Sequence, residues 1–303
     1  MSAHRSLGWV PLALAAATAA AVVLAGARPA GAEPILDGIV RTYQDAGSLW
    51  LARVAPLART LFASLAALEL VVAAIVWLLR SETMDGILRG LAKKFLLLGF
   101  FYALIALFPA FVPYVVYSFE KAGQSASGSL ALSPSAVVDQ GIFVAAQLFD
   151  NVTTAGLLAH PAGALLWPLV ALIVFLAYVA IAAQLVLALV ESYFVVTSGS
   201  LFLGFAGFRA TATLADNYLL YAFQVGVKIF LLYMLVAAGQ DFTAAWTRDL
   251  LDAGFLSDSG LRASLRVLAG SVIYAFLVWR IPGHVAGFLT HNAQFRFRDA
   301  LAS

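Results

Sequence analysis

The sequence has no cysteine and few charged residues, and both shortages narrow the class of protein. Without cysteine there can be no disulfide, zinc-thiolate site, iron-sulfur cluster or thiol nucleophile. Charged residues make up 11% of the 303 residues, whereas soluble domains carry roughly 25%. Hydrophobic residues make up 63%, so the surface chemistry excludes a water-soluble globule.

Motifs for enzyme chemistry are also missing. The sequence contains no G-x-x-x-x-G-K-[ST] phosphate loop, and its GQSASGS stretch does not have the G-x-S-x-G arrangement of a serine nucleophile. The histidines are scattered at His4, His160, His284 and His291, with no metal-ligand spacing. We therefore predict no catalytic residue, no cofactor and no metal.

Long apolar blocks are what the sequence does have. They are continuous and do not alternate with polar residues, which argues against an outer-membrane barrel. About 20 apolar residues cross a bilayer as a helix, and the blocks fit five spans at about 57–79, 95–116, 164–187, 218–237 and 265–281. The predicted fold is an all-α, polytopic helical membrane protein, with its membrane domain over 57–303.

Residues 1–32 have the pattern of a secretory signal peptide. A short basic start with Arg5 precedes an apolar region, and Ala30-Gly31-Ala32 is a typical small-residue cleavage site. The alternative is an uncleaved first transmembrane helix. Either interpretation exports the chain from Glu33 onward.

Charge placement predicts the orientation. The loop after the first span carries Arg80, Arg89, Lys93 and Lys94, which marks it as cytoplasmic. Residues 33–56 form an expected amphipathic periplasmic helix, and the loops 118–162 and 239–263 are expected to be periplasmic. A second amphipathic helix is expected to start at Ser133-Pro134. The tail, 282–303, is then cytoplasmic, in the bacterial inner membrane.

The segment 192–208 decides between two topologies. A full crossing would give six spans and would invert the orientation of every later loop. A re-entrant hairpin on the cytoplasmic side keeps five spans and the charge distribution above. Its small residues include Gly199, Gly204 and Gly207, which fit a hinge or an unwound segment buried in protein. We expect the hairpin.

Polar side chains at membrane depth are the candidate functional residues. Three are charged, Glu69, Glu191 and Lys228, and two are amides, Gln184 and Gln224. Because an isolated charge costs roughly 3 kcal/mol in the bilayer, such residues face a partner, the bundle interior or water. They either line a pathway or form a packing pair in which Lys228 joins Glu69 or Glu191.

Four stretches resemble the TrbL family, a polytopic inner-membrane subunit of conjugative type IV secretion systems. They are LSPSAVVDQGIFVA at 132–145, LALVESYFVVTSGSLFLGFAGFR at 187–209, NYLLYAFQVGVKIFLLYMLVAAG at 217–239 and IPGHVAGFL at 281–289. The resemblance implies a non-enzymatic channel or platform subunit that helps pass single-stranded DNA and attached protein across the inner membrane. Implied partners are a pilus-tip or minor pilin, an inner-membrane scaffold, cytoplasmic ATPases and further copies of the chain, besides the lipid bilayer.

Two other functions are compatible with the sequence. One is a small-solute transporter or membrane enzyme that uses Glu191 and Lys228, which would favour paired broken helices in two inverted repeats. The other is a purely structural scaffold of the secretion complex.

Overall fold

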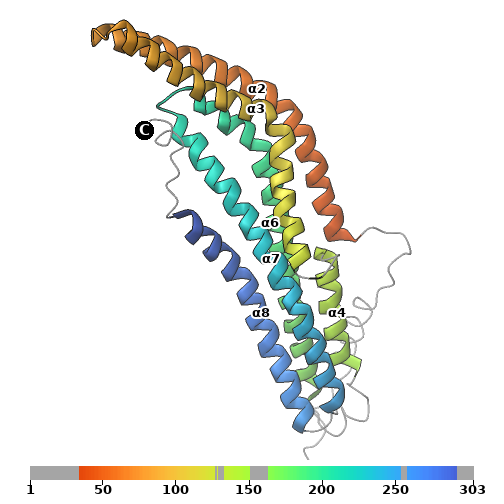
Figure 1. The fold of residues 1–303 in the computed structure, drawn as a ribbon. Coiled ribbons are helices and arrows are strands. Elements are labelled where there is room, and N and C mark those ends of the chain that lie inside the picture. Colours follow the sequence, from red (N-terminus) through yellow and green to blue (C-terminus); the bar gives the residue numbers. More distant parts are fainter. Residues whose placement is uncertain (1–33, 127, 129–132, 151–162, 254–257, 292–303) are drawn as a thin grey trace, which may run out of the picture. The chain divides into compact units, whose positions relative to one another are not determined.

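The structure is a computed structural model that describes residues 34–126, 128, 133–150, 163–253 and 258–291. Every secondary-structure element in these ranges is a helix (Figure 1). The elements are α2 (Ile35–Leu79), α3 (Met84–Ala126), α4 (Pro134–Asp150), α6 (Gly163–Gly204), the 3-10 turn η1 (Phe205–Gly207), α7 (Ala212–Ala253) and α8 (Asp258–His291). The all-α fold class is confirmed.

Five of these helices are long and apolar enough to cross a membrane, namely α2, α3, α6, α7 and α8. Each is longer than its predicted span. From Ile35 onward, the predicted amphipathic stretch and the span 57–79 belong to one 45-residue helix, α2. The composition changes near residue 57, but the backbone stays helical through Pro56. At 1.5 Å per residue α2 is about 68 Å long, more than twice the ~30 Å hydrocarbon core.

The re-entrant hairpin expected at 192–208 is not confirmed, since most of this segment lies in one continuous helix. Helix α6 continues to Gly204 and ends in η1 before the chain turns into α7. The polar residues do not unwind it, because their hydroxyls donate to carbonyls about one turn earlier: Ser192 to Leu189 at 2.6 Å, Thr197 to Tyr193 at 2.8 Å and Ser198 to Phe194 at 2.8 Å.

The glycines of this segment serve close packing. A Cβ added at Gly199 would lie 1.8 Å from the Tyr218 hydroxyl oxygen, and one at Gly207 would lie 2.6 Å from the Phe62 carbonyl oxygen. A Cβ added at Gly204 would lie 3.0 Å from the Ala58 carbonyl oxygen. These positions let α6 and η1 approach α2 and α7, which is the common use of small residues between membrane helices.

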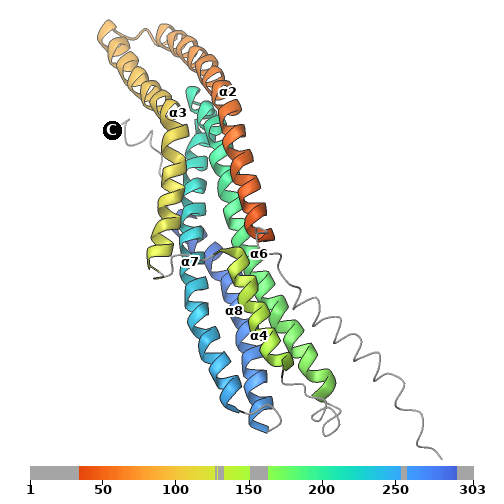
Figure 2. The same ribbon diagram turned by 90° about the vertical axis from the view of Figure 1, so that its right-hand side faces the viewer.

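The chain divides into two compact units. The first comprises Met1–Gly38, Ser127–Val186 and Tyr233–Ile281, and the second Ile39–Ala126, Leu187–Leu232 and Pro282–Ser303. In the first unit, α4 packs on α6, and α7 runs beside α8 (Figure 2). Hydroxyls form hydrogen bonds in its core: Tyr178 bonds Thr243, and Tyr274 donates to the Val236 carbonyl at 3.3 Å.

Helix α4 begins where the sequence predicted. The Ser133 hydroxyl accepts from the Ala136 N–H at 3.1 Å, so Ser133 is the N-cap and Pro134 the first helical residue. Asp37, at the start of α2, adds a reciprocal contact. Its carboxylate accepts from the Ser135 N–H, and its own N–H donates to the Ser135 hydroxyl, both at 3.3 Å. The cap thus also joins α4 to α2.

The second unit is built around the α2–α3 hairpin, whose helices lie side by side (Figure 1). Phe101, Ile105 and Phe108 form the fully buried stripe of α3, at helical spacing. The rest of the hairpin is open: 17% of the most apolar window of α2 is buried, against 50% for α6. Most of its apolar surface is therefore available to lipid or to other chains.

Candidate functional site

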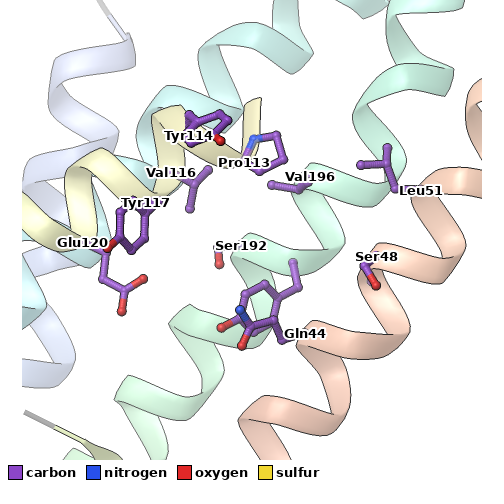
Figure 3. Close-up of a pocket in the computed structure, with 12 residues that line it drawn as sticks. Gln44, Ser48, Leu51, Pro113, Tyr114, Val116, Tyr117, Glu120, Ser192 and Val196 are labelled. Atoms are coloured by element: carbon purple, nitrogen blue, oxygen red, sulfur yellow. The ribbon is translucent and has the colours of Figure 1, made fainter. Parts of the chain in front are cut away.

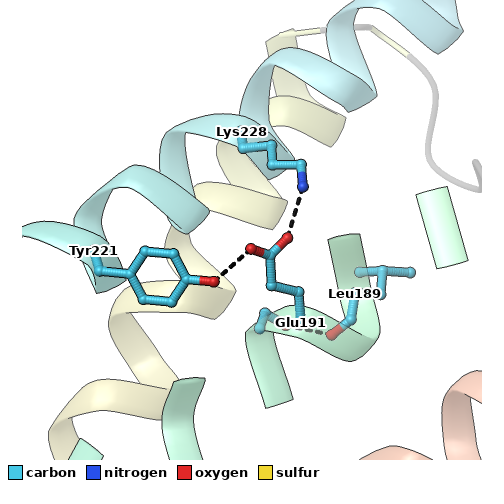
Figure 4. A network of polar contacts seen from close by, with 5 residues as sticks. Leu189, Glu191, Tyr221 and Lys228 are labelled. Carbon is cyan, nitrogen blue, oxygen red and sulfur yellow. Dashed lines mark hydrogen bonds and ion pairs between the residues drawn. The ribbon is translucent and has the colours of Figure 1, made fainter. Parts of the chain in front are cut away.

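Glu191 on α6 and Lys228 on α7 form an ion pair. The Lys228 Nζ lies 2.6 Å from Glu191 Oε2, and the Tyr221 hydroxyl donates to Glu191 Oε1 at 2.6 Å (Figure 4). Tyr221 and Lys228 are two turns apart on α7, so both reach the same carboxylate. Of the two lysine pairings left open by the sequence, the structure has the one with Glu191.

Both side chains of this pair are partly exposed. The side chain of Lys228 is 20% exposed and that of Glu191 29%. Both carboxylate oxygens have a donor, which removes most of the desolvation cost of a charge in a membrane helix. The cluster can therefore hold α6 against α7, and its exposed edge can meet water or a passing polar group.

Glu69 on α2 has different partners from those expected. Its Oε1 pairs with Lys94 of α3, and its Oε2 accepts from the Arg209 N–H at 3.0 Å, in the turn after η1. The residue is 8% exposed. One carboxylate thus joins α2, α3 and the start of the α6–α7 connection.

Sequence reasoning missed Lys94 as the partner, although a signal was available. Glu69 lies ten residues before the end of α2 at Leu79, and Lys94 lies ten residues after the start of α3 at Met84. In an antiparallel hairpin with a short turn these positions are at the same depth. As a charge near the loop, Lys94 contributes only to the predicted orientation.

The two predicted glutamines belong to different units. Gln184 is 9% exposed and lies in the first unit, whereas Gln224 is half-buried on α7 in the second. Gln224 is 3.8 Å from where a Cβ on Gly287 would lie, so it faces the end of α8. Neither belongs to the Glu191 cluster shown in Figure 4.

A cavity of about 440 Å³ lies between α2, α3 and α6 in the second unit. Polar groups enter it from each helix: Gln44 and Ser48, Glu120, and Ser192 (Figure 3). Tyr114, Tyr117 and Tyr193 supply much of the remaining wall. A space of this size and polarity can hold water next to membrane helices. No local pattern in the sequence indicates this cavity, because its residues come from three distant stretches.

No metal-ligand set is present among the residues that the structure describes. Within the described ranges, no three His, Cys, Asp or Glu side chains gather where they could hold an ion.

Five long apolar helices with paired charges between them define a multi-pass helical membrane protein. Residues 40–281 match the family of the TrbL/VirB6 plasmid conjugal transfer protein. The chain belongs to this family, which confirms the resemblance seen in the sequence.

Two named relatives agree with this family. The chain is 27% identical over 256 residues to a probable conjugal transfer protein TrbL of Sinorhizobium fredii (strain NBRC 101917 / NGR234), covering 83% of this chain and 63% of that protein. It is 28% identical over 269 residues to the conjugal transfer protein TrbL of Rhizobium radiobacter, covering 88% and 66%. The chain thus spans just under two thirds of the length of either relative.

Proposed function

We propose that this protein is a non-enzymatic inner-membrane subunit of a conjugative type IV secretion apparatus. The observation that carries the proposal is the family match over residues 40–281, which includes most of the five membrane helices. Both relatives are named for conjugal transfer. In this role the subunit works with other secretion subunits, namely a pilus-tip protein, a scaffold and the ATPases that supply energy.

A mating assay tests the proposal. The gene is deleted in frame from the donor, with neighbouring genes intact, and the wild-type gene is returned in trans. We expect plasmid transfer to fall to background in the deletion and to recover on complementation. Undiminished transfer in the deletion strain would overturn the proposal.

The finer proposal is that the second unit contributes to the path of single-stranded DNA and attached protein. The partly exposed Glu191–Lys228–Tyr221 cluster and the polar cavity between α2, α3 and α6 support it, because both offer polar surface within membrane helices. A photoreactive amino acid replaces Tyr221, and a matched control replaces Phe276, which is 63% exposed on α8. Plasmid DNA crosslinked at 221 and not at 276 during mating supports a conduit. Equal, background-level DNA crosslinking at both positions favours a scaffold that does not line the DNA path.

We also propose a periplasmic N-terminus, a cytoplasmic C-terminus and a homo-oligomeric assembly. The basic residues around the α2–α3 turn support the orientation. The open faces of α2 and α3 support the assembly, since helices of this length carry apolar surface that a ~30 Å hydrocarbon core does not cover. A reporter fused in the α2–α3 turn, active only in the cytoplasm, tests the orientation. Crosslinking of full-length chains in membranes tests the assembly, and a uniformly monomeric product would exclude it.

A further inference from the structure

A groove of about 490 Å³ lies in the second unit, beside the α2–α3 turn and the turn that follows η1. Five charged residues line it: Glu69, Arg80, Glu82, Lys94 and Arg209. Three are cations and two are carboxylates, so the lining has a net charge of +1. None of these charges is used by the Glu191 cluster.

Of the two carboxylates in the groove, Glu69 is already paired, which leaves Glu82 as the one negative charge opposite the arginines. Glu69 pairs with Lys94 and accepts from the Arg209 N–H, so its charge is offset inside the protein. The guanidinium groups of Arg80 and Arg209 remain, both on exposed residues. Within the described part of the chain, neither guanidinium has a hydrogen-bond or ion-pair partner. The groove therefore presents two arginine forks whose donors are unused.

The other wall of the groove is apolar and belongs to a membrane helix. Val72 and Val76 of α2 line it and are 39% and 38% exposed. Trp77 also lines it and packs on α3 at Gly90, where a Cβ would lie 2.9 Å from the Trp77 ring. Tryptophan at the end of a membrane helix is typical of the interface between headgroups and acyl chains. The arginines of the groove thus lie beside an apolar surface that is suited to contact lipid.

We propose that this groove binds the phosphate headgroup of an anionic phospholipid, with an acyl chain along Val72 and Val76. Arginine guanidinium is suited to this because its planar fork donates two parallel hydrogen bonds to phosphate oxygens. Single-stranded DNA fits the groove less well. It needs a long basic track with aromatic faces for stacked bases, and the Trp77 ring is partly covered by its packing on Gly90.

Native mass spectrometry of the full chain in detergent tests this proposal. The protein is offered equal amounts of phosphatidylglycerol and phosphatidylcholine with identical acyl chains. The test variant is Arg80→Gln with Arg209→Gln, and the matched control is Arg89→Gln, an exposed arginine on the same hairpin outside the groove. At about 1 kcal/mol per cation, loss of both arginines weakens phosphatidylglycerol retention about 30-fold. The control retains the wild-type preference.

Competition experiments distinguish a lipid from free phosphate and from DNA as the ligand, and a charge-conserving variant serves as a further control. Inorganic phosphate and a single-stranded oligonucleotide are each added as competitors. Continued phosphatidylglycerol retention against both supports a lipid site. Displacement by free phosphate at equal concentration, or by the oligonucleotide, would overturn it, as would equal retention of both lipids by the wild type. The variant Arg80→Lys with Arg209→Lys keeps the charge and should restore at least part of the retention. If the lysine variant retains no more phosphatidylglycerol than the glutamine variant, the proposal that the groove recognises the headgroup by charge is wrong.

Discussion

The two units differ in the polar contacts that hold their helices together. Both units use hydroxyl hydrogen bonds, such as Tyr178 with Thr243 in the first and Tyr218 with the Val195 carbonyl in the second, but the second unit also has ion pairs. In the second, two carboxylates are paired with lysines, Glu69 with Lys94 and Glu191 with Lys228. A neutral hydrogen bond contributes about 1 kcal/mol, whereas breaking a buried ion pair costs about 3 kcal/mol or more. A single substitution at an ion pair of the second unit is therefore expected to lower the free energy of unfolding more than one at a hydroxyl of the first unit.

The largest effect is expected at Glu69. The change Glu69→Leu leaves the Lys94 ammonium and the Arg209 N–H without their acceptor, and we expect a loss of about 3 kcal/mol in the free energy of unfolding. SDS titration of the purified full chain measures this value. Glu82→Leu, at an exposed carboxylate on the same hairpin, is the control and should change it by less than about 0.5 kcal/mol.

A double variant sharpens this test. Glu69→Leu with Lys94→Met removes both charges, so part of the lost stability should return. If the single and double variants are equally unstable, the loss comes from packing and not from an unpaired charge.

The next effect is expected at Gly207. Gly207→Ala puts a methyl group 2.6 Å from the Phe62 carbonyl oxygen, and η1 must move away from α2. Overpacking of this kind costs about 1–3 kcal/mol. Gly99→Ala on α3 is the matched control, because nothing lies within 4 Å of its Cβ position. Accumulation of each variant in the membrane compares them. Equal levels would show that the close approach is not required.

The Glu191–Lys228 pair should give a smaller loss, because its side chains are 29% and 20% exposed. We expect Glu191→Gln to cost about 1–2 kcal/mol, measured as reduced subunit accumulation. Adding Lys228→Met should recover part of it. A transporter or relay would behave differently: transfer would fall while accumulation stayed at the wild-type level.

The smallest effect is expected in the first unit. Tyr178→Phe removes one hydroxyl and leaves Thr243 its bond to the Gly239 carbonyl at 2.7 Å. We expect about 1 kcal/mol, obtained by the same SDS titration. A loss as large as that at Glu69 would contradict the comparison between the units.

Local signals in the sequence predicted a good part of this structure. Ser133 and Pro134 identified the start of α4, because capping depends on neighbouring residues only. The apolar blocks identified five membrane helices. Glu191 and Lys228 could be proposed as a pair because charges are rare in such blocks, so few alternatives existed.

The errors came from features that depend on distant contacts. Helix α2 is 45 residues long because Pro56, between its amphipathic and apolar halves, does not end it, and hydropathy measures only the second half. The hairpin expected at 192–208 is not confirmed, because glycine indicates either a bend or a close neighbour. Only the positions of Phe62 and Tyr218 distinguish the two. The cavity lined by Gln44, Glu120 and Ser192 likewise depends on three separate stretches.

The three-way contact at Glu69 has a consequence for biogenesis. Lys94 follows Glu69 within one hairpin, so their pair can form as soon as α2 and α3 have been synthesised. Arg209 is 115 residues beyond Lys94, since 209 − 94 = 115. At roughly 5–20 residues per second, its N–H arrives about 6–23 s later. Lys94 can thus neutralise Glu69 during membrane insertion, and the turn after η1 docks onto a carboxylate that is already in place.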